Sequence, residues 1–349
     1  MKTPRLVPIL PFFLLFLAVG ASAQTVDALY QAAKQEGVLN LYGGGPARIY
    51  TIYTEQFEKE YPGVKVNVVG GFSNTLTDKI DAEIKGGKSI ADVTTLQTIQ
   101  SFVRWKKEGK LLLFKPEGFD QIPDVFKDPE GYYHPDRVGG IVFGYNPTLV
   151  PKDQIPKNYA DFLKPYWKGR IISTYPQTDD ITLYLYYHIV QKYGWRFMEE
   201  LMKLEPVFVD GHTGVNEKIF KGESSLTFDA IIGQTTIDKL QKRSIELAFG
   251  EEPFPVWAQT TAIFKDAPHP NAAKLYVTWA LSRQVQIRKA TTGYWSGRND
   301  VPPAPGIKPL SEYKILDGFR EFITNDERVE KLRAEFGKHI KYVKGVEYR

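Results

Sequence analysis

The chain has 349 residues, which at about 150 residues per domain suggests two domains, and it contains no cysteine. Its hydrophobic residues (42%) and charged residues (25%) are close to globular averages, which excludes a disordered, collagen-like or coiled-coil chain. The 45 lysine and arginine residues exceed the 41 aspartate and glutamate residues only slightly and form no basic run, so no nucleic-acid partner is expected.

Residues 1–23 have the pattern of a secretory signal peptide. Lys2 and Arg5 precede an apolar run over 6–19, and Ala21-Ser22-Ala23 matches a cleavage site. The apolar run is too short for a comfortable membrane span. Because cysteine is absent, a lipid anchor has no thiol to modify. We therefore expect a soluble periplasmic protein that is not a lipoprotein.

After the signal peptide, helical and strand patterns alternate. Apolar residues at helical spacing are followed by short runs rich in β-branched residues, and this happens three times. The β-α-β-α-β order predicts a parallel sheet covered by helices on both faces. The expected elements, in chain order, are a helix over 26–36, a strand over 38–42, a helix over 46–61, a strand over 64–69, a helix capped by Ser73 or Asn74, and a strand over 90–96.

A second block of alternating elements begins near Gly140. A connection rich in proline over 147–165 follows its first strand, and another proline-rich segment covers 301–309. The expected elements are strands over 141–145, 170–173, 225–228 and 256–264, and helices over 181–193, 231–240, 271–290 and 325–341.

Several segments carry a family resemblance. Residues 57–66 have the sequence FEKEYPGVKV, and residues 159–170 have the sequence YADFLKPYWKGR. Further matching segments lie at 91–93, 144–147, 221–223, 269–273 and 293–301. Together these motifs resemble type 2 periplasmic solute-binding proteins of ABC importers, in the branch with ferric-ion, thiamine and sugar-phosphate binders. The resemblance spans nearly the whole mature chain.

The resemblance implies the periplasmic-binding-protein-like II fold, an α/β architecture in two lobes, each a mostly parallel sheet flanked by helices, with the ligand cleft between them. The implied division is lobe 1 over 24–138, lobe 2 over 139–258, and a return to lobe 1 over 259–349 that includes C-terminal helices. The implied partners are a small-molecule ligand and an inner-membrane ABC permease. We expect a monomer without a cofactor.

The carboxyl ends of the predicted strands supply candidate ligand-binding residues, because open parallel sheets bind ligands there. Gly44 and Gly45 precede a helix start, whose free N–H groups favour an anion, and Arg48 adds a bidentate donor. Arg48→Ala should therefore weaken binding roughly tenfold or more. The anion is a hypothesis from these residues, and sugars and amines stay open. The other candidates are Ser73, Asn74, Thr95, Tyr175, Thr178, Asp229 and Trp257.

These candidates also have purely structural interpretations. Ser73, Asn74 and Asp229 can cap helices. Threonine is common in β-strands whatever their function, so Thr95 needs no ligand to explain it, and an aromatic residue such as Trp257 is common in a buried core.

Other functions remain as alternatives. Ferric-binding relatives hold iron through adjacent tyrosines shortly after the segment that matches 221–223, where this chain has Ile232-Gly233. Tyrosine pairs do occur at Tyr132-Tyr133 and Tyr186-Tyr187, so iron stays open, although no histidine has a partner at metal-ligand spacing and no metal ligand is assigned. No nucleotide-binding, serine-hydrolase or zinc-protease motif occurs, so no catalytic residue is expected. A secreted hydrolase and a sensory receptor are the alternatives from other classes.

Overall fold

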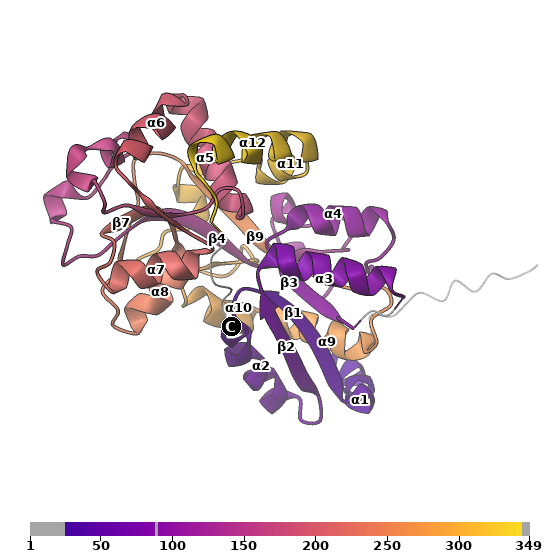
Figure 1. The fold of residues 1–349 in the computed structure, drawn as a ribbon. Helices are drawn as coiled ribbons and strands as arrows, with labels where there is room; N and C mark the ends of the chain where they lie inside the picture. Colours follow the sequence, from indigo (N-terminus) through magenta and orange to yellow (C-terminus); the bar gives the residue numbers. More distant parts are fainter. Residues whose placement is uncertain (1–24, 88–89, 344–349) are drawn as a thin grey trace, which may run out of the picture.

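The computed structural model describes residues 25–87 and 90–343. It consists of two lobes joined by two long strands, β4 (His134–Tyr145) and β9 (Phe254–Ile263) (Figure 1). This is the α/β two-lobed fold class that the resemblance implies. The lobe boundaries predicted near 138 and 258 fall inside β4 and β9. The predicted signal peptide lies outside the described residues.

The first lobe is built on three parallel strands. Strand β1 lies between β2 and β3, and its Tyr42 is level with Val69 on one side and Thr94 on the other. Every residue of β3 is buried, as expected for a strand covered on both faces. The elements of this lobe are α1 (Val26–Glu36), β1 (Val38–Gly44), α2 (Arg48–Glu60), β2 (Lys65–Gly71), α3 (Ser73–Lys85), β3 (Val93–Leu96), α4 (Ile99–Lys107), α9 (Pro270–Leu281) and α10 (Arg283–Ala290).

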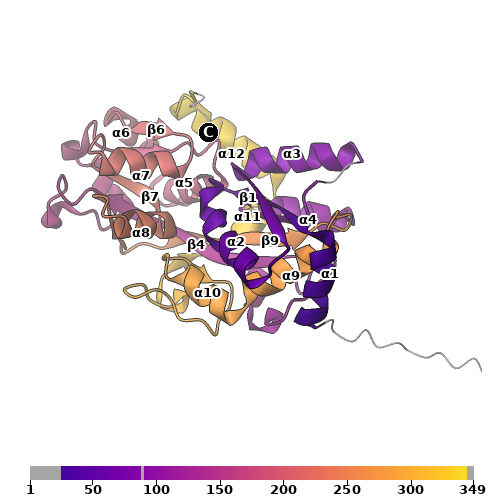
Figure 2. The same ribbon diagram turned by 90° about the horizontal axis from the view of Figure 1, so that it is seen from below.

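The second lobe contains a parallel pair of short strands and two strands that pair with β4. Figure 2 shows its helices on one side of the molecule, with α1, α3, α4 and α9 of the first lobe on the other. Its elements are β5 (Ile172–Thr174), α5 (Asp180–Tyr193), α6 (Arg196–Lys203), β6 (Val207–Val209), α7 (His212–Phe220), β7 (Leu226–Ile231), α8 (Ile232–Leu240) and β8 (Glu246–Ala248). Strands β5 and β6 are parallel, and β7 and β8 run antiparallel to β4.

The two crossing strands belong to the sheets of both lobes. They pair antiparallel with each other, with Arg137 opposite Gln259 and Gly139 opposite Trp257. Strand β9 continues into the first lobe by pairing with β3, whereas β4 continues into the second lobe by pairing with β7. Two short strands, β10 (Trp295–Ser296) and β11 (Ile315–Leu316), add to the edges of β4 and β9. Side chains on these crossing strands therefore lie between the lobes.

Two local predictions fail for identifiable reasons. The helix predicted over 271–290 is interrupted at Ser282, whose extended backbone ends α9 and whose hydroxyl accepts a hydrogen bond from the Val285 N–H at the start of α10. Neither Ser73 nor Asn74 caps α3. The residue that precedes α3 is Phe72, and the hydroxyl of Ser73 instead accepts the N–H of Gln97 at 3.1 Å.

The C-terminal helices α11 (Phe319–Ile323) and α12 (Asp326–His339) lie against the second lobe (Figure 1). Tyr184 of α5 packs against Phe319 and Phe322, and Phe336 of α12 packs against Tyr186 and Trp195. Within residues 25–87 and 90–343, no helix is long and apolar enough to cross a membrane.

Candidate ligand-binding site

The ends of β1 and β3 meet the start of α3 around Gly44. The hydroxyl of Tyr50 donates to the Gly44 carbonyl at 3.0 Å and lies 3.3 Å from the Thr95 carbonyl. A Cβ atom at Gly44 would overlap the Ser73 hydroxyl and would lie 2.9 Å from Nε2 of Gln259. The glycine therefore lets a first-lobe hydroxyl and a side chain of a crossing strand approach the same point of the backbone.

Strand β9 contributes Gln259 and Trp257 to this cluster. The amide Nε2 of Gln259 donates to the Thr95 carbonyl at 3.3 Å and to the Tyr50 hydroxyl at 3.4 Å. Its Oε1 accepts from the indole of Trp257 at 3.4 Å. Both side chains are buried, and their hydrogen bonds tie the crossing strand to the carboxyl end of the first-lobe sheet.

Strand β4 contributes Arg137, which lies opposite Gln259. Its guanidinium carbon is 5.4 Å from the ring centre of Tyr50 and 5.0 Å from that of Tyr294, so the cation lies against two aromatic rings. Arg137 is 6% exposed and forms an ion pair with the neighbouring Asp136 at 2.7 Å.

The carboxylate that pairs with Arg137 has a second basic partner. Asp136 also forms an ion pair with Lys289, so one carboxylate serves two cations. Burial opposes ionisation of Asp136, but the charges of Lys289 and Arg137 outweigh it and lower the pKa of this carboxyl. Burial lowers the pKa of Lys289, and the ion pair with Asp136 opposes that effect and favours the charged ammonium.

The other titratable groups nearby do not supply a compensating negative charge. Burial lowers the pKa of His134 to about 4, which leaves it neutral at pH 7. Burial raises the pKa values of Tyr50 and Tyr294, so both phenols stay neutral. Asp238 is paired with Arg243. Two basic side chains, Arg137 and Lys289, therefore share one buried carboxylate, a setting that favours a further anion.

The second lobe supplies a buried polar network around Asp229. Its carboxylate accepts from the Ser173 hydroxyl at 2.9 Å and from the Thr174 N–H at 2.8 Å, and the Thr227 hydroxyl is a further donor. Burial raises the pKa of this carboxyl. Asp229 thus joins β7 to β5.

The loop between β5 and α5 carries Tyr175 and Thr178. The Tyr175 ring stacks on Phe208, and the Thr178 hydroxyl donates to Asp210 at 3.1 Å. The neighbouring Gly211 faces the other lobe, because a Cβ atom there would lie 2.7 Å from the ring of Phe72. The lobes are therefore in contact next to this loop.

The predicted site residues fall into three groups in the structure. Gly44, Ser73, Thr95 and Trp257 come together around Tyr50 and Gln259, with Gly45 and Asn74 next to them in the chain. Arg48 is an exposed residue at the start of α2. Tyr175, Thr178 and Asp229 lie in the second lobe. None of these positions is tested by a bound ligand, so their role in binding stays a prediction.

Sequence reasoning missed Arg137 and Tyr50. The sequence predicts a crossover near 137–142 and a strand that begins at Ile141, but it does not single out Arg137 or Tyr50 as ligand-binding residues. One signal was present: Asp136 and Arg137 directly precede an apolar run, and charged residues within a buried strand usually occur in pairs.

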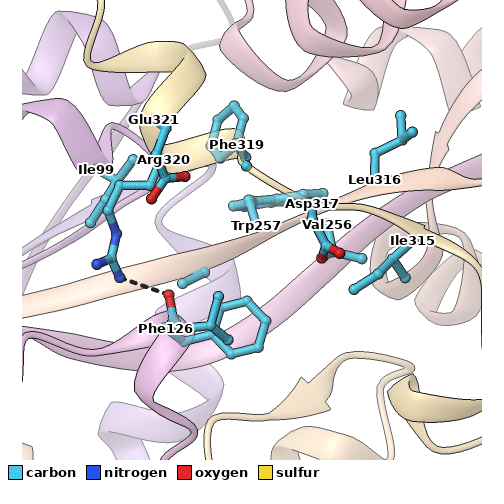
Figure 3. Close-up of a pocket in the computed structure, with 13 residues that line it drawn as sticks. Ile99, Phe126, Val256, Trp257, Ile315, Leu316, Asp317, Phe319, Arg320 and Glu321 are labelled. Carbon is cyan, nitrogen blue, oxygen red and sulfur yellow. Dashed lines mark hydrogen bonds between the residues drawn. The ribbon is translucent and has the colours of Figure 1, made fainter.

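A separate cavity lies along the other edge of β9, where the strand has no partner between β11 and β3. It measures about 90 Å³ and is lined mainly by apolar residues, among them Ile99, Phe126, Val256 and Phe319 (Figure 3). At its rim, Arg320 donates to the Val125 carbonyl at 2.7 Å. Because its walls are mainly apolar, this cavity does not suit a polar solute as well as the cluster around Arg137 does.

Metal-binding side chains do not gather in the described residues. No group of three or more histidine, cysteine, aspartate and glutamate residues there is arranged to hold a metal ion. The hydroxyl of Tyr186 donates to Ser173 inside the second lobe, and Tyr187 packs against Phe322. At the position that the resemblance assigns to iron-binding tyrosines, a side chain on Gly233 would overlap the ring of Tyr294.

Residues 53–314, most of the chain, match the model of the bacterial extracellular solute-binding protein family. The chain belongs to this family. The protein is accordingly a solute receptor of the kind that serves ABC-type import, as the sequence motifs indicate, and the family implies a small-molecule ligand and a permease partner.

Relatives and solved structures agree with this assignment. An uncharacterised protein of Haemophilus influenzae is 24% identical over 270 residues, which is 74% of this chain and 77% of that protein. An Fe(3+)-binding periplasmic protein of Serratia marcescens is 25% identical over 156 residues, 45% of this chain and 43% of that protein.

Two solved structures share the fold. The periplasmic binding protein AfuA from Actinobacillus pleuropneumoniae, with fructose-6-phosphate bound, has a TM-score of 0.74 and 22% identity, covering 88% of this chain and 99% of that one. Iron-bound HitA from Pseudomonas aeruginosa has a TM-score of 0.72 and 19% identity, and the match covers 86% of this chain and 99% of that one. At these identities the likeness concerns the fold, and it confirms the two-lobed α/β architecture.

Proposed function

We propose that this receptor captures a small anionic solute between its lobes and delivers it to an inner-membrane ABC permease without chemically changing it. The observation that carries the anion is that Arg137, buried between Tyr50 and Tyr294, shares its carboxylate partner Asp136 with Lys289. A neutral or cationic solute would add no negative charge beside these two basic side chains, and buried charges are costly unless they are fully paired.

Uncharged donors complement the arginine. Helices α3 and α8 begin beside the same cluster, and neither has a side chain that caps its first N–H groups. Free N–H groups at a helix start favour a negative charge. Ser73 and Gln259 add neutral hydrogen-bonding groups, so the site suits an oxyanion that also carries hydroxyl groups.

Closure of the lobes is the proposed mechanism of capture. A ligand stabilises the closed state only to the extent that it binds that state more tightly. Arg137 and Gln259 lie on the crossing strands, Ser73 lies in the first lobe, and the start of α8 lies in the second lobe. A solute that contacts all of them is bound tightly only when the lobes are together, and the permease receives the closed complex.

The relatives differ in what they bind. AfuA was solved with a sugar phosphate and HitA with iron. For this chain we favour the oxyanion over free Fe³⁺, because Arg137 and Lys289 share one carboxylate and Gly233 supplies no tyrosine. The receptor is proposed to act in the periplasm as a monomer, with no nucleic-acid partner and no catalytic residue.

A thermal-shift screen tests the proposal. The protein is unfolded and refolded first, so that any co-purified solute is lost, and is then heated with phosphorylated sugars, organic acids, phosphonates, thiamine, polyols and ferric citrate. A solute at 100 times its dissociation constant adds about 2.7 kcal/mol, a shift of several degrees. Stabilisation by a phosphorylated sugar, organic acid or phosphonate supports the proposal. If only thiamine or polyols stabilise the protein, the proposal that its solute is an anion is contradicted.

A further inference from the structure

Arg137 is held between two tyrosine rings, and each ring lies over a glycine. A side chain on Gly43 would overlap the ring of Tyr50, and a side chain on Gly233 would overlap the ring of Tyr294. Gly43 belongs to β1 in the first lobe, whereas Gly233 belongs to α8 in the second. The guanidinium on the crossing strand is therefore flanked by one ring seated on each lobe.

The two rings are fixed in different ways. Tyr50 is anchored within the first lobe, because its hydroxyl contacts the carbonyls of Gly44 and Thr95. Tyr294 follows α10, which packs on the first-lobe helix α9 through the hydrogen bond from Gln286 to the Ala280 carbonyl at 2.8 Å. The ring of Tyr294 nevertheless rests on the second-lobe helix α8, so this contact exists only while the lobes are together.

We propose that Tyr294 is a positioning residue that holds the Arg137 guanidinium in place for an anion, and that Gly233 makes this hold depend on lobe closure. The anion-binding part rests on the proposed function above. An arginine side chain loses much rotational freedom when it is fixed, so a residue that fixes it in the closed state strengthens binding there. The attraction between the guanidinium and the ring supplies that restraint.

The substitution Gly233→Ala tests the contact without removing either ring or the arginine. Alanine favours the helix, so α8 should form, but the new methyl group forces the Tyr294 ring to move. Gly337→Ala is the matched control, because this glycine also lies inside a helix and an added Cβ there has no atom within 4 Å.

The first readout needs no ligand, because the lobes are together in the structure and both rings already flank Arg137. Phenylglyoxal modifies accessible guanidinium groups, and peptide mass mapping follows Arg137 with the exposed Arg48 as an internal reference. We expect Arg137 to react roughly tenfold faster in Gly233→Ala than in the unsubstituted protein, with no change in Gly337→Ala. Equal Arg137 rates in all three proteins would overturn the proposal. Tyr294→Leu, which keeps Gly233, should reproduce the faster reaction, and an unchanged rate there would equally overturn it.

The second readout uses fructose 6-phosphate and inorganic phosphate as probes in calorimetric titrations. Gly233→Ala and Tyr294→Leu should weaken binding roughly tenfold, and Tyr294→Phe, which keeps the ring, should bind nearly as the unsubstituted protein does. Full affinity in Tyr294→Leu would overturn the positioning role. If neither probe binds the unsubstituted protein, that result counts against the proposed anion, while the labelling rates still decide whether Tyr294 holds Arg137.

Discussion

Arg137 has one carboxylate partner and two aromatic neighbours, and the same carboxylate also serves Lys289. A carboxylate that is shared by two basic side chains neutralises the guanidinium only in part. Burial strengthens any further electrostatic interaction that the guanidinium makes. We therefore expect the proposed anion to bind beside this guanidinium.

The residue-scale prediction compares two arginines. Arg137→Gln removes the charge at similar length and should weaken binding of the stabilising anion roughly thirtyfold, because a hydrogen bond to a charged group is lost. Arg48→Ala, which the sequence predicts to cost roughly tenfold, should cost less, because its exposed side chain is screened by solvent.

Isothermal titration calorimetry of both variants ranks the two side chains, and circular dichroism checks that each variant is folded. A larger loss of affinity in Arg48→Ala than in Arg137→Gln would place the anion site at Gly44, Gly45 and Arg48 instead of at Arg137. Binding unchanged in Arg137→Gln would remove this residue from the site.

At the scale of single elements, the carboxyl end of β1 and the amino end of α3 form the first-lobe wall of the site. Ser73 is the first residue of α3, and its hydroxyl accepts from Gln97 beyond β3. This hydrogen bond joins the helix start to the neighbouring strand end. Gly44 permits Ser73 and Gln259 to approach the same point of the backbone, where a side chain would otherwise lie.

Gly44→Ala is the prediction for this wall. The added methyl group would displace Ser73 or Gln259, so we expect anion affinity to fall roughly tenfold while the sheet still forms. Gly71→Ala is the local control, because the atoms nearest to a Cβ there belong to the Leu76 side chain at 3.4 Å or more, an ordinary van der Waals distance. Titration of both variants with the same anion checks the prediction, and similar losses in the two would contradict it.

Local sequence predicts most of the helices and strands, and the interrupted helix at Ser282 shows where local sequence is not enough. The predicted helix at 26–36 and the strand start at Val38 match α1 and β1, because spacing and Gly37 act within a few residues. The break at Ser282 was missed. Its cause is partly distant, since Gln286 and Lys289 after the break reach Asp136 on β4.

At the scale of the whole molecule, several contacts connect the lobes outside the crossing strands, and three of them involve residues already described. Phe72 meets Gly211, and Tyr294 rests on Gly233. Asp180 at the start of α5 accepts from Gln100 of α4 at 2.8 Å and from Arg333 of α12 at 2.7 Å. The last of these joins the two lobes and the C-terminal helix through one buried carboxylate.

Two buried histidines predict how stability depends on pH. Burial lowers the pKa of His134 to about 4, so the folded state disfavours its proton and stability rises as pH increases from about 4 to 6.5. For His212, burial lowers the pKa, but the charges and hydrogen bonds of Asp179 and Asp229 together outweigh burial and raise it to about 9. The folded state therefore retains that proton, and stability falls as pH increases from 6.5 to about 9.

These opposing effects predict that the free energy of unfolding is greatest near pH 6.5, with each limb on the order of 3 kcal/mol. Urea unfolding between pH 4 and 9 measures both limbs. His134→Gln should flatten only the acidic limb and His212→Gln only the alkaline limb, so each variant is the control for the other. An alkaline limb that persists in His212→Gln would show that another group causes it.

The sequence by itself determined the order of helices and strands, the two-lobed α/β fold and the membership in a solute-binding family. Spacing, glycine and proline act locally, and the motifs at 57–66 and 159–170 belong to the junctions between elements. It also located Gly44, Ser73, Thr95 and Trp257 at strand ends and crossovers, because that position follows from topology alone.

Only the tertiary structure decided which charges meet. Asp136 and Arg137 are adjacent in the chain, but Lys289 joins them from α10, Tyr50 from α2 and Tyr294 from the loop before β10. The sharing of one carboxylate by two basic side chains depends on residues from distant segments, and no local pattern encodes it. Burial then strengthens the interactions of these charges, and burial is a property of the packed lobes.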